Sequence, residues 1–198
     1  MIGRLRGELV EVHGATATID CGGVGYEVQL PESVLLQLPP VGQNVDIRIR
    51  QVFREDGTYL YGFVDLFQRK LFDLLTEVKG CGPKIGLSLL GQLGEHAVVG
   101  AILASDTKSL ARATGVGPRL AERINLELKD KVTELATMQR IQAAVDGTYR
   151  VGELVDDELV EVLLTLGYRR QEAEMAARGA TGNNVEDRLK LALRSLAR

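Results

Sequence analysis

The feature that most constrains this chain is an internal repeat with a period of 35 residues. The segment 75–84 aligns with the segment 110–119, and each copy contains Gly-x-Gly-Pro followed by a basic residue. Apolar residues at helical spacing stand before and after each Gly-x-Gly-Pro sequence. The repeat therefore predicts two helical hairpins in tandem, each with a sharp, glycine-rich turn.

Each predicted turn has the chemistry of an anion site. The first glycine can adopt positive φ and end a helix, and the second leaves the main chain open to a ligand. The proline fits the first turn of the next helix, whose free N–H groups and positive dipole end attract an anion. A basic side chain then follows the proline, and a further arginine lies one turn later in the second copy. The candidate DNA phosphate-binding residues are Gly80, Gly82, Lys84, Gly115, Gly117, Arg119 and Arg123.

The glycine-rich turns also have other interpretations. Both could be tight turns inside a helical bundle, with no ligand at all. A phosphate-binding loop of the ATPase kind would need Gly-Lys-Ser/Thr at its end, and we find no Walker motif in the sequence. Contacts to phosphates alone do not read bases, so we expect DNA binding without sequence preference.

The pattern of apolar residues divides the chain into parts. Residues 1–64 contain short β-rich runs separated by Gly, Pro and Asp-Gly signals, which predict a small barrel. The period then changes from 2 to 3.6, and residues 65–135 are expected to be helical. Residues 136–152 lack a sustained apolar face and are interpreted as a flexible linker or a frayed helix end. Residues 153–198 predict a compact three-helix module, so the predicted fold class is α+β and multidomain. The expected strands are Leu9–Val12, Ala15–Cys21, Tyr26–Leu30, Val45–Val52 and Tyr59–Val64.

Composition and charge limit the class of protein. With 45% hydrophobic and 26% charged residues, the chain has the composition of a globular protein. The formal net charge is −3, and the segment 65–134, at +1, is the only one that is not acidic. Phosphate binding must then depend on local geometry rather than on bulk charge. No apolar run approaches the roughly 18 residues of a membrane span, and the start lacks the apolar core of a signal peptide, so we expect a cytoplasmic protein.

We expect neither a metal site nor a cofactor. The two histidines, His13 and His96, and the two cysteines are scattered and show no zinc-ligand spacing. Cys21 and Cys81 stand where small apolar residues would serve, so we interpret both as packing residues.

A pair of carboxylates is expected at the tip of a β-hairpin. Glu55 and Asp56 precede Gly57 between two expected strands, and Asp-Gly in that setting is a strong signal for a hairpin turn. They could be ordinary solvated turn residues, and a metal site of the nuclease type would need further ligands. In a DNA-binding protein, paired negative charges could instead repel phosphates and hold strands apart at a crossover.

Taken together, these motifs resemble the bacterial RuvA family. The resemblance is carried by the segments 1–7, 22–28, 54–56 and 60–63 and by both Gly-x-Gly-Pro-basic turns, and it extends over the whole chain. It implies an N-terminal OB-fold barrel, a double helix-hairpin-helix domain and a small, mobile, UBA-like C-terminal domain. It also implies that Glu55 and Asp56 form the family's acidic pin.

The family resemblance also implies partners and a function. Members form homotetramers that hold a four-way Holliday junction open and flat, and they recruit the hexameric ATPase RuvB for branch migration in recombination and repair. The C-terminal domain engages RuvB, and Leu163, Leu166 and Tyr168 resemble that surface, although each could equally belong to the domain's core. Pairing of two tetramers into an octamer, and contact with the resolvase RuvC, are left open. Family members often carry Lys where Pro118 stands here, which removes one basic contact.

Two other classes of protein remain as alternatives. A DNA repair enzyme of the glycosylase or lyase type also uses helix-hairpin-helix motifs, but it needs a catalytic Asp or Lys after the hairpin, where 125–130 offers only a charged helical face. A pure protein-interaction adaptor would leave two anion sites without a use. We therefore expect a non-catalytic accessory subunit of a branch migration complex.

Overall fold

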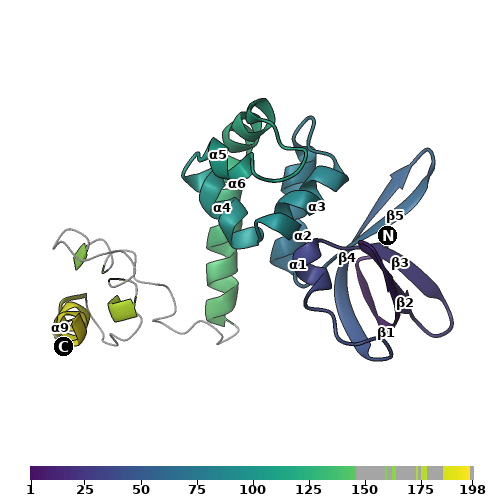
Figure 1. Cartoon of the computed structure of the whole chain (residues 1–198), viewed down its shortest axis with the longest axis horizontal. Helices are drawn as coiled ribbons and strands as arrows, with labels where there is room; N and C mark the ends of the chain where they lie inside the picture. The colour runs from purple at the N-terminus through teal and green to yellow at the C-terminus, as the bar shows by residue number, and fades with distance from the viewer. Residues whose placement is uncertain (146–158, 160–161, 164–172, 174, 178–184, 197–198) are drawn as a thin grey trace. The chain divides into compact units, whose positions relative to one another are not determined.

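The structure, a computed structural model, describes residues 1–145, 159, 162–163, 173, 175–177 and 185–196 (Figure 1). The chain forms two compact units, Met1–Gln139 and Arg140–Arg198. The first unit holds the expected barrel and helical hairpins, and each of these has its own hydrophobic core. The predicted α+β fold class is thereby confirmed.

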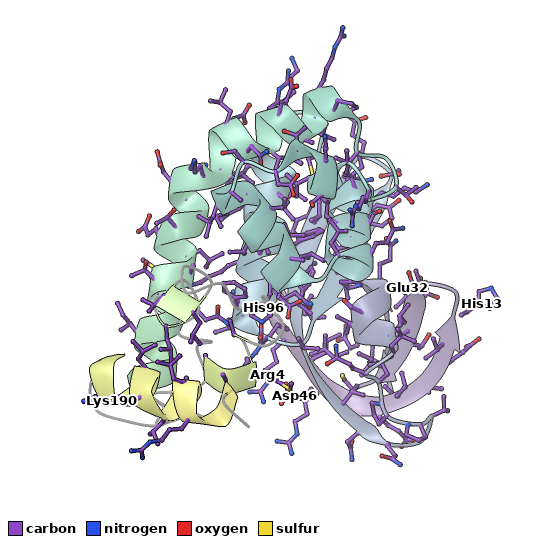
Figure 2. All side chains as sticks on the ribbon, turned by 60° about the vertical axis from the view of Figure 1, so that its left-hand side comes forward. Arg4, His13, Glu32, Asp46, His96 and Lys190 are labelled. Atoms are coloured by element: carbon purple, nitrogen blue, oxygen red, sulfur yellow. The ribbon has the colours of Figure 1, made fainter. Side chains whose placement is uncertain are left out.

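Five strands close into a barrel in the first unit. Its strands follow one another round the barrel in the order β1, β2, β3, β5, β4, and every pairing is antiparallel except that of β3 with β5. A short helix that the sequence analysis did not expect, α1 (Glu32–Leu35), follows β3. On the outer surface, Arg4 and Asp46 of neighbouring strands form an ion pair (Figure 2). The strands are β1 (Arg4–His13), β2 (Thr16–Asp20), β3 (Gly25–Gln29), β4 (Asn44–Arg54) and β5 (Gly57–Phe63).

Strand β1 is longer than expected because it has two partners. It pairs with β4 over Arg4–Glu8 and with β2 from Glu8 to His13, with an irregularity between Leu9 and Glu11. A Cβ atom at Gly7 would lie 2.0 Å from the carbonyl oxygen of Asp20, so only glycine permits this approach of the two backbones. The charged residues that alternate at the start of β1 concealed it from a search for apolar runs.

The two faces of β5 join the barrel to the helices. Leu60 faces the barrel, and a Cβ at Gly62 would lie 2.5 Å from Leu30 in the barrel core. Tyr61 and Phe63 face the other way and pack on Phe72, with ring centroids 5.3 and 4.8 Å away. Alternation along one strand therefore supplies both cores. The helices are α2 (Leu66–Glu77), α3 (Pro83–Gln92), α4 (Glu95–Leu103), α5 (Thr107–Leu110) and α6 (Pro118–Val145).

Polar contacts fix the helix that follows the barrel. The Asp65 side chain accepts a hydrogen bond from the Gln68 N–H at 2.8 Å, and the Gln68 side chain accepts one from the Val64 N–H at 3.2 Å. The arrangement resembles a capping box, except that Gln68 accepts from the residue before the N-cap, and it satisfies two N–H groups at the start of α2. Arg50 of β4 pairs with Asp73 of α2, which raises the pKa of the Arg50 guanidinium.

Helix α6 continues beyond the boundary at residue 135 that the sequence pattern suggested. It is described as far as Val145, so the first ten residues of the segment 136–152, interpreted as a linker or frayed end, are helical. Leu135 is the last residue in the helical core. The sequence after it shows no sustained apolar pattern from which the helix could be predicted. The rest of that segment lies outside the described residues.

In the second unit, the described residues form a small apolar cluster. Leu159 and Leu163, three alanines at 173, 176 and 177, and Ala192 of helix α9 (Val185–Leu196) are buried together. They come from all three helical patterns that the sequence predicts. The cluster is consistent with a three-helix module.

The described helices were also compared with the dimensions of a bilayer. None of them alone is long and apolar enough to cross a membrane. Helices α3 and α4 reach that limit only together, across a bend of 100°, and both bury side chains in the helical core. Within the described residues, no group of three or more His, Cys, Asp or Glu side chains is placed to hold a metal ion.

Candidate nucleic-acid interface

The two glycine-rich turns adopt the same backbone geometry. Helix α2 turns into α3 through residues 78–82, and α5 turns into α6 through residues 111–117. The first glycine of each turn has positive φ, +93° at Gly80 and +89° at Gly115. Only glycine adopts this conformation without strain, so these two positions serve the fold itself. The prediction of two helical hairpins in tandem is confirmed.

The hairpins pack against each other in a reciprocal way. A Cβ atom at Gly115 would lie 3.3 Å from Ile85, the second residue after the proline of the first hairpin. A Cβ at Gly80 would lie 3.8 Å from Leu120, the equivalent residue of the second hairpin. Each turn thus rests on the first helical turn of the other, and the two helix N-termini are held as a fixed pair.

The second glycine of each turn has no structural reason to be glycine. Gly82 has φ −72°, an ordinary value, and a Cβ atom at Gly82 or Gly117 would have no neighbour within 4 Å. Both residues are exposed. The fold would accept a side chain at either position, so the open space in front of each backbone is available to a ligand.

Free donors point out of the same two helix starts. In α3, the first hydrogen bonds to a preceding carbonyl are from the N–H groups of Ile85 and Gly86 to Gly82. In α6, Leu120 and Ala121 donate to Gly117 in the same way. The N–H groups of Lys84 and Arg119, one position earlier, make no backbone hydrogen bond. These donors and the positive ends of the two helices give both helix starts the chemistry that an anion site needs.

The basic side chains differ in how they are held. Lys84 and Arg119 are exposed, and neither makes a hydrogen bond or ion pair within the described residues. Arg123 instead donates to the carbonyl oxygen of Lys79 at 2.9 Å, and it lies 3.8 Å from Glu127. Arg123 therefore braces the first hairpin turn, a role that its spacing from Arg119 did not reveal.

The acidic pair lies at the tip of the β4–β5 hairpin. Glu55 and Asp56 form its two-residue turn and are exposed. The Tyr59 hydroxyl donates to Asp56 at 2.9 Å, and this contact with a carboxylate raises the pKa of Tyr59. The guanidinium of Arg54 lies 5.1 Å from the centre of the Tyr59 ring, within the range of a cation–π contact. Tyr59 thus contacts one residue of the turn, Asp56, and the last residue of β4, Arg54.

Arg54 and Tyr59 also line a groove of about 550 Å³ that runs from the barrel to α3. Lys84 and Thr114, one residue from each helical hairpin, line the same groove. Gln92 connects these elements, since its side-chain amide donates to the Thr114 hydroxyl at 3.0 Å and accepts from the Thr114 N–H at 2.9 Å. The sequence analysis gave Arg54 and Tyr59 no role of their own, because the groove exists only once the barrel and the helices pack together.

Of the three residues that resemble a partner-binding surface, only Leu163 is described. It is fully buried in the apolar cluster of the second unit. Leu163 therefore has the core position that the sequence had left open as an alternative. Leu166 and Tyr168 lie outside the described residues.

An OB-fold barrel joined to tandem helix-hairpin-helix motifs defines a class of DNA-binding proteins. The family described as the RuvA N-terminal domain matches residues 1–62, and the SAM-like helix-hairpin-helix tandem matches residues 72–130. The chain belongs to the RuvA family, since its full-length relatives share more than a third of their residues with it.

Three of these relatives illustrate the match, and each is named Holliday junction branch migration complex subunit RuvA. The protein of Stutzerimonas stutzeri is 36% identical over 99% of this chain and 100% of its own length. That of Vibrio cholerae is 36% identical over the same shares, and that of Deinococcus radiodurans is 40% identical over 94% of this chain and 92% of its own. These matches support the interpretation of the chain as a branch migration complex subunit. They give no support to the alternative, a repair enzyme of the glycosylase type.

Proposed function

We propose that this chain is a non-catalytic subunit that binds Holliday junction DNA, opens it, and recruits the RuvB ATPase for branch migration. The observation that carries this proposal is the pair of open glycines. Gly82 and Gly117 have no need of glycine within the chain, yet both stand directly before a helix N-terminus and a free cation. A phosphate that approaches the backbone closely explains why a side chain is absent at both positions.

The reciprocal packing of the hairpins supports a duplex as the ligand. Two anion sites held at a fixed spacing can contact two phosphates of one backbone, which positions DNA without reading its sequence. The acidic tip at Glu55 and Asp56 lies on the hairpin whose Arg54 and Tyr59 share the groove with Lys84. We assign the two carboxylates the role of a pin that repels phosphates and keeps strands apart at the crossover.

The proposed assembly is a homotetramer in the cytoplasm. A single chain carries a net charge of −3, which opposes DNA binding, whereas four chains would gather eight anion sites around one junction. We assign the contact with RuvB to the C-terminal module. A second tetramer on the same junction and a contact with the resolvase RuvC are further proposals.

A gel-shift comparison tests the phosphate sites. Binding to a synthetic four-way junction and to linear duplex of equal length is measured for the wild type and for the double variant Gly82→Ala, Gly117→Ala. We expect wild-type protein to prefer the junction and the double variant to lose at least about tenfold in affinity, since each new Cβ blocks a charge-assisted contact. Its thermal stability should be close to that of the wild type, because both positions are open.

Gly100→Ala is the matched control. Gly100 lies on α4, and its Cβ would also have no neighbour within 4 Å, so the chemical change is the same but away from both turns. Its affinity for the junction should not change. Equal binding of wild-type protein to junction and duplex would refute the junction assignment, and unchanged binding by the double variant would show that the phosphate sites lie elsewhere.

A further inference from the structure

One aromatic side chain lies uncovered beside the acidic tip. Phe53 is 69% exposed, whereas Phe63, Phe67 and Phe72 are all buried. Among the described residues it is the only Phe or Tyr that is largely exposed. It belongs to neither hydrophobic core of the first unit and stacks on no described ring.

The register of the hairpin shows which face carries this ring. Phe53 has the same parity along β4 as Ile47 and Ile49, which fill the barrel, and its cross-strand partner is Thr58. Arg54, Val52 and Tyr59 occupy the opposite face, where the last two pack on the helical core. Between Ile49 and Phe53, the Gln51 side chain accepts a hydrogen bond from the Ile2 N–H at 2.7 Å. Phe53 therefore lies on the barrel-lining face of β4, beyond the last residues of that face that contact the barrel core.

The fold gains little from a phenylalanine at this position. A β-branched or polar residue would suit a two-stranded hairpin in water, as Thr58 does opposite, and an exposed ring leaves apolar area in contact with solvent. The ring is therefore available to a partner outside the chain. That partner must also tolerate Glu55 and Asp56, which begin two residues further on.

We propose that Phe53 stacks on an unpaired nucleobase at the strand crossover. Two carboxylates disfavour a phosphate nearby, but they do not repel the uncharged face of a base. Aromatic side chains stack on bases regardless of sequence, which matches the expected lack of sequence preference. The tip of the hairpin then has two functions: its carboxylates hold the backbones apart, and the ring on its barrel-side face covers a base that has lost its neighbour.

This inference rests on the proposed junction binding, so its test must separate the two. The chain contains no tryptophan, and Phe53→Trp therefore introduces a single fluorescent reporter at the position in question. Leu36→Trp, at a position 83% exposed at the end of α1, is the matched control. Gel shifts on the same samples establish whether each full-length variant binds the junction.

With saturating four-way junction, Phe53→Trp should lose most of its tryptophan emission through stacking, and Leu36→Trp should keep its emission. Linear duplex, in which the bases remain paired, should quench neither. Phe53→Leu, which keeps an apolar side chain but removes the ring, should bind the junction about tenfold more weakly than wild type. Because Phe53 is exposed, its replacement does not endanger folding.

Two outcomes would overturn the inference while leaving the proposed function intact. In one, both tryptophan variants bind the junction and their emission is unchanged. In the other, the emission of Phe53→Trp shifts to shorter wavelength as protein concentration rises without DNA, which would mean that a second copy of the chain covers the ring. Failure of the wild type to prefer the junction in the gel shift would instead refute the proposed function.

Discussion

At the residue scale, Gly80 and Gly82 lie four and two positions before Lys84 and differ in what the backbone requires of them. Gly80 has positive φ and serves the turn, whereas Gly82 has ordinary backbone angles and open space in front of it. The sequence analysis expected this division from the order of the two glycines, and the backbone angles and the open space at each position agree with it. Backbone geometry thus separates the glycine that the fold requires from the glycine that the proposed phosphate contact would use.

The two cysteines differ in burial, and this difference predicts different reactivity. Cys81 is 1% exposed within the first hairpin turn, and burial raises the pKa of its thiol to about 11. Cys21 is half-buried at the end of β2. Because the thiolate is the nucleophile, Cys81 should stay protonated and unreactive near pH 8.

Alkylation with iodoacetamide followed by mass spectrometry measures this difference. In the folded protein at pH 8, one equivalent should react, at Cys21, and Cys81 should be labelled only after denaturation. Cys21→Ser protein, which keeps Cys81 as its single cysteine, should remain unmodified when folded. Rapid labelling of Cys81 in that variant would mean that the first hairpin turn opens frequently.

At the scale of elements, the shortest helix depends on its cap. Helix α5 has four residues, and the Asp106 carboxylate accepts hydrogen bonds from the Ser109 hydroxyl at 2.5 Å and the Ser109 N–H at 3.1 Å. The bond from the Ser109 hydroxyl has the larger effect and the bond from the Ser109 N–H the smaller, and both hold the pKa of Asp106 below its ordinary value. The folded state therefore favours the charged carboxylate. Its stabilising effect is present above the ordinary pKa and is lost as pH falls through the lower, folded pKa.

Thermal melts of wild-type protein and Asp106→Ala between pH 7 and pH 3 test this cap. At pH 7 the variant should melt at a lower temperature than the wild type, since both hydrogen bonds of the cap are lost. The difference in melting temperature should shrink as pH falls below about 4, because the carboxylate of the wild type then becomes protonated and loses its charge. A difference that is constant across this range would show that the charge of Asp106 does not contribute.

The elements also show where prediction from sequence succeeded and failed. The hairpin turns and most strands were predictable, because positive φ, helix starts and alternation depend on local residue types. Helix α1 was not, since it is held by packing on α3, where its Glu32 backbone would lie 2.7 Å from a Cβ at Gly91. The continuation of α6 past residue 135 was missed because no sustained apolar pattern marks it. Arg54, Tyr59 and Phe53 were missed because their importance depends on which face of a hairpin meets which neighbour.

At the scale of the whole molecule, an acidic chain must bind a polyanion. The segment 65–134 carries only +1, so under the proposed function Lys84 and Arg119 would act through their position at two helix starts rather than through an extended basic surface. Binding should therefore depend on salt through a small, countable number of phosphate contacts. Each contact adds about −0.9 to the slope of log K against log salt concentration for duplex DNA.

This slope predicts the number of chains on one junction. Lys84→Gln removes one cation per chain, so the slope should become shallower by about 1 if one chain binds and by about 4 if four equivalent chains bind together. The measurement is a fluorescence-anisotropy titration of a labelled junction from low to moderate salt. Lys70→Gln is the control, because Lys70 is an exposed lysine on α2 outside both hairpin turns, and its slope should match the wild type. A change near 4 would support the tetramer, whereas a change near 1 would show that the acidic chain binds DNA through one pair of hairpins.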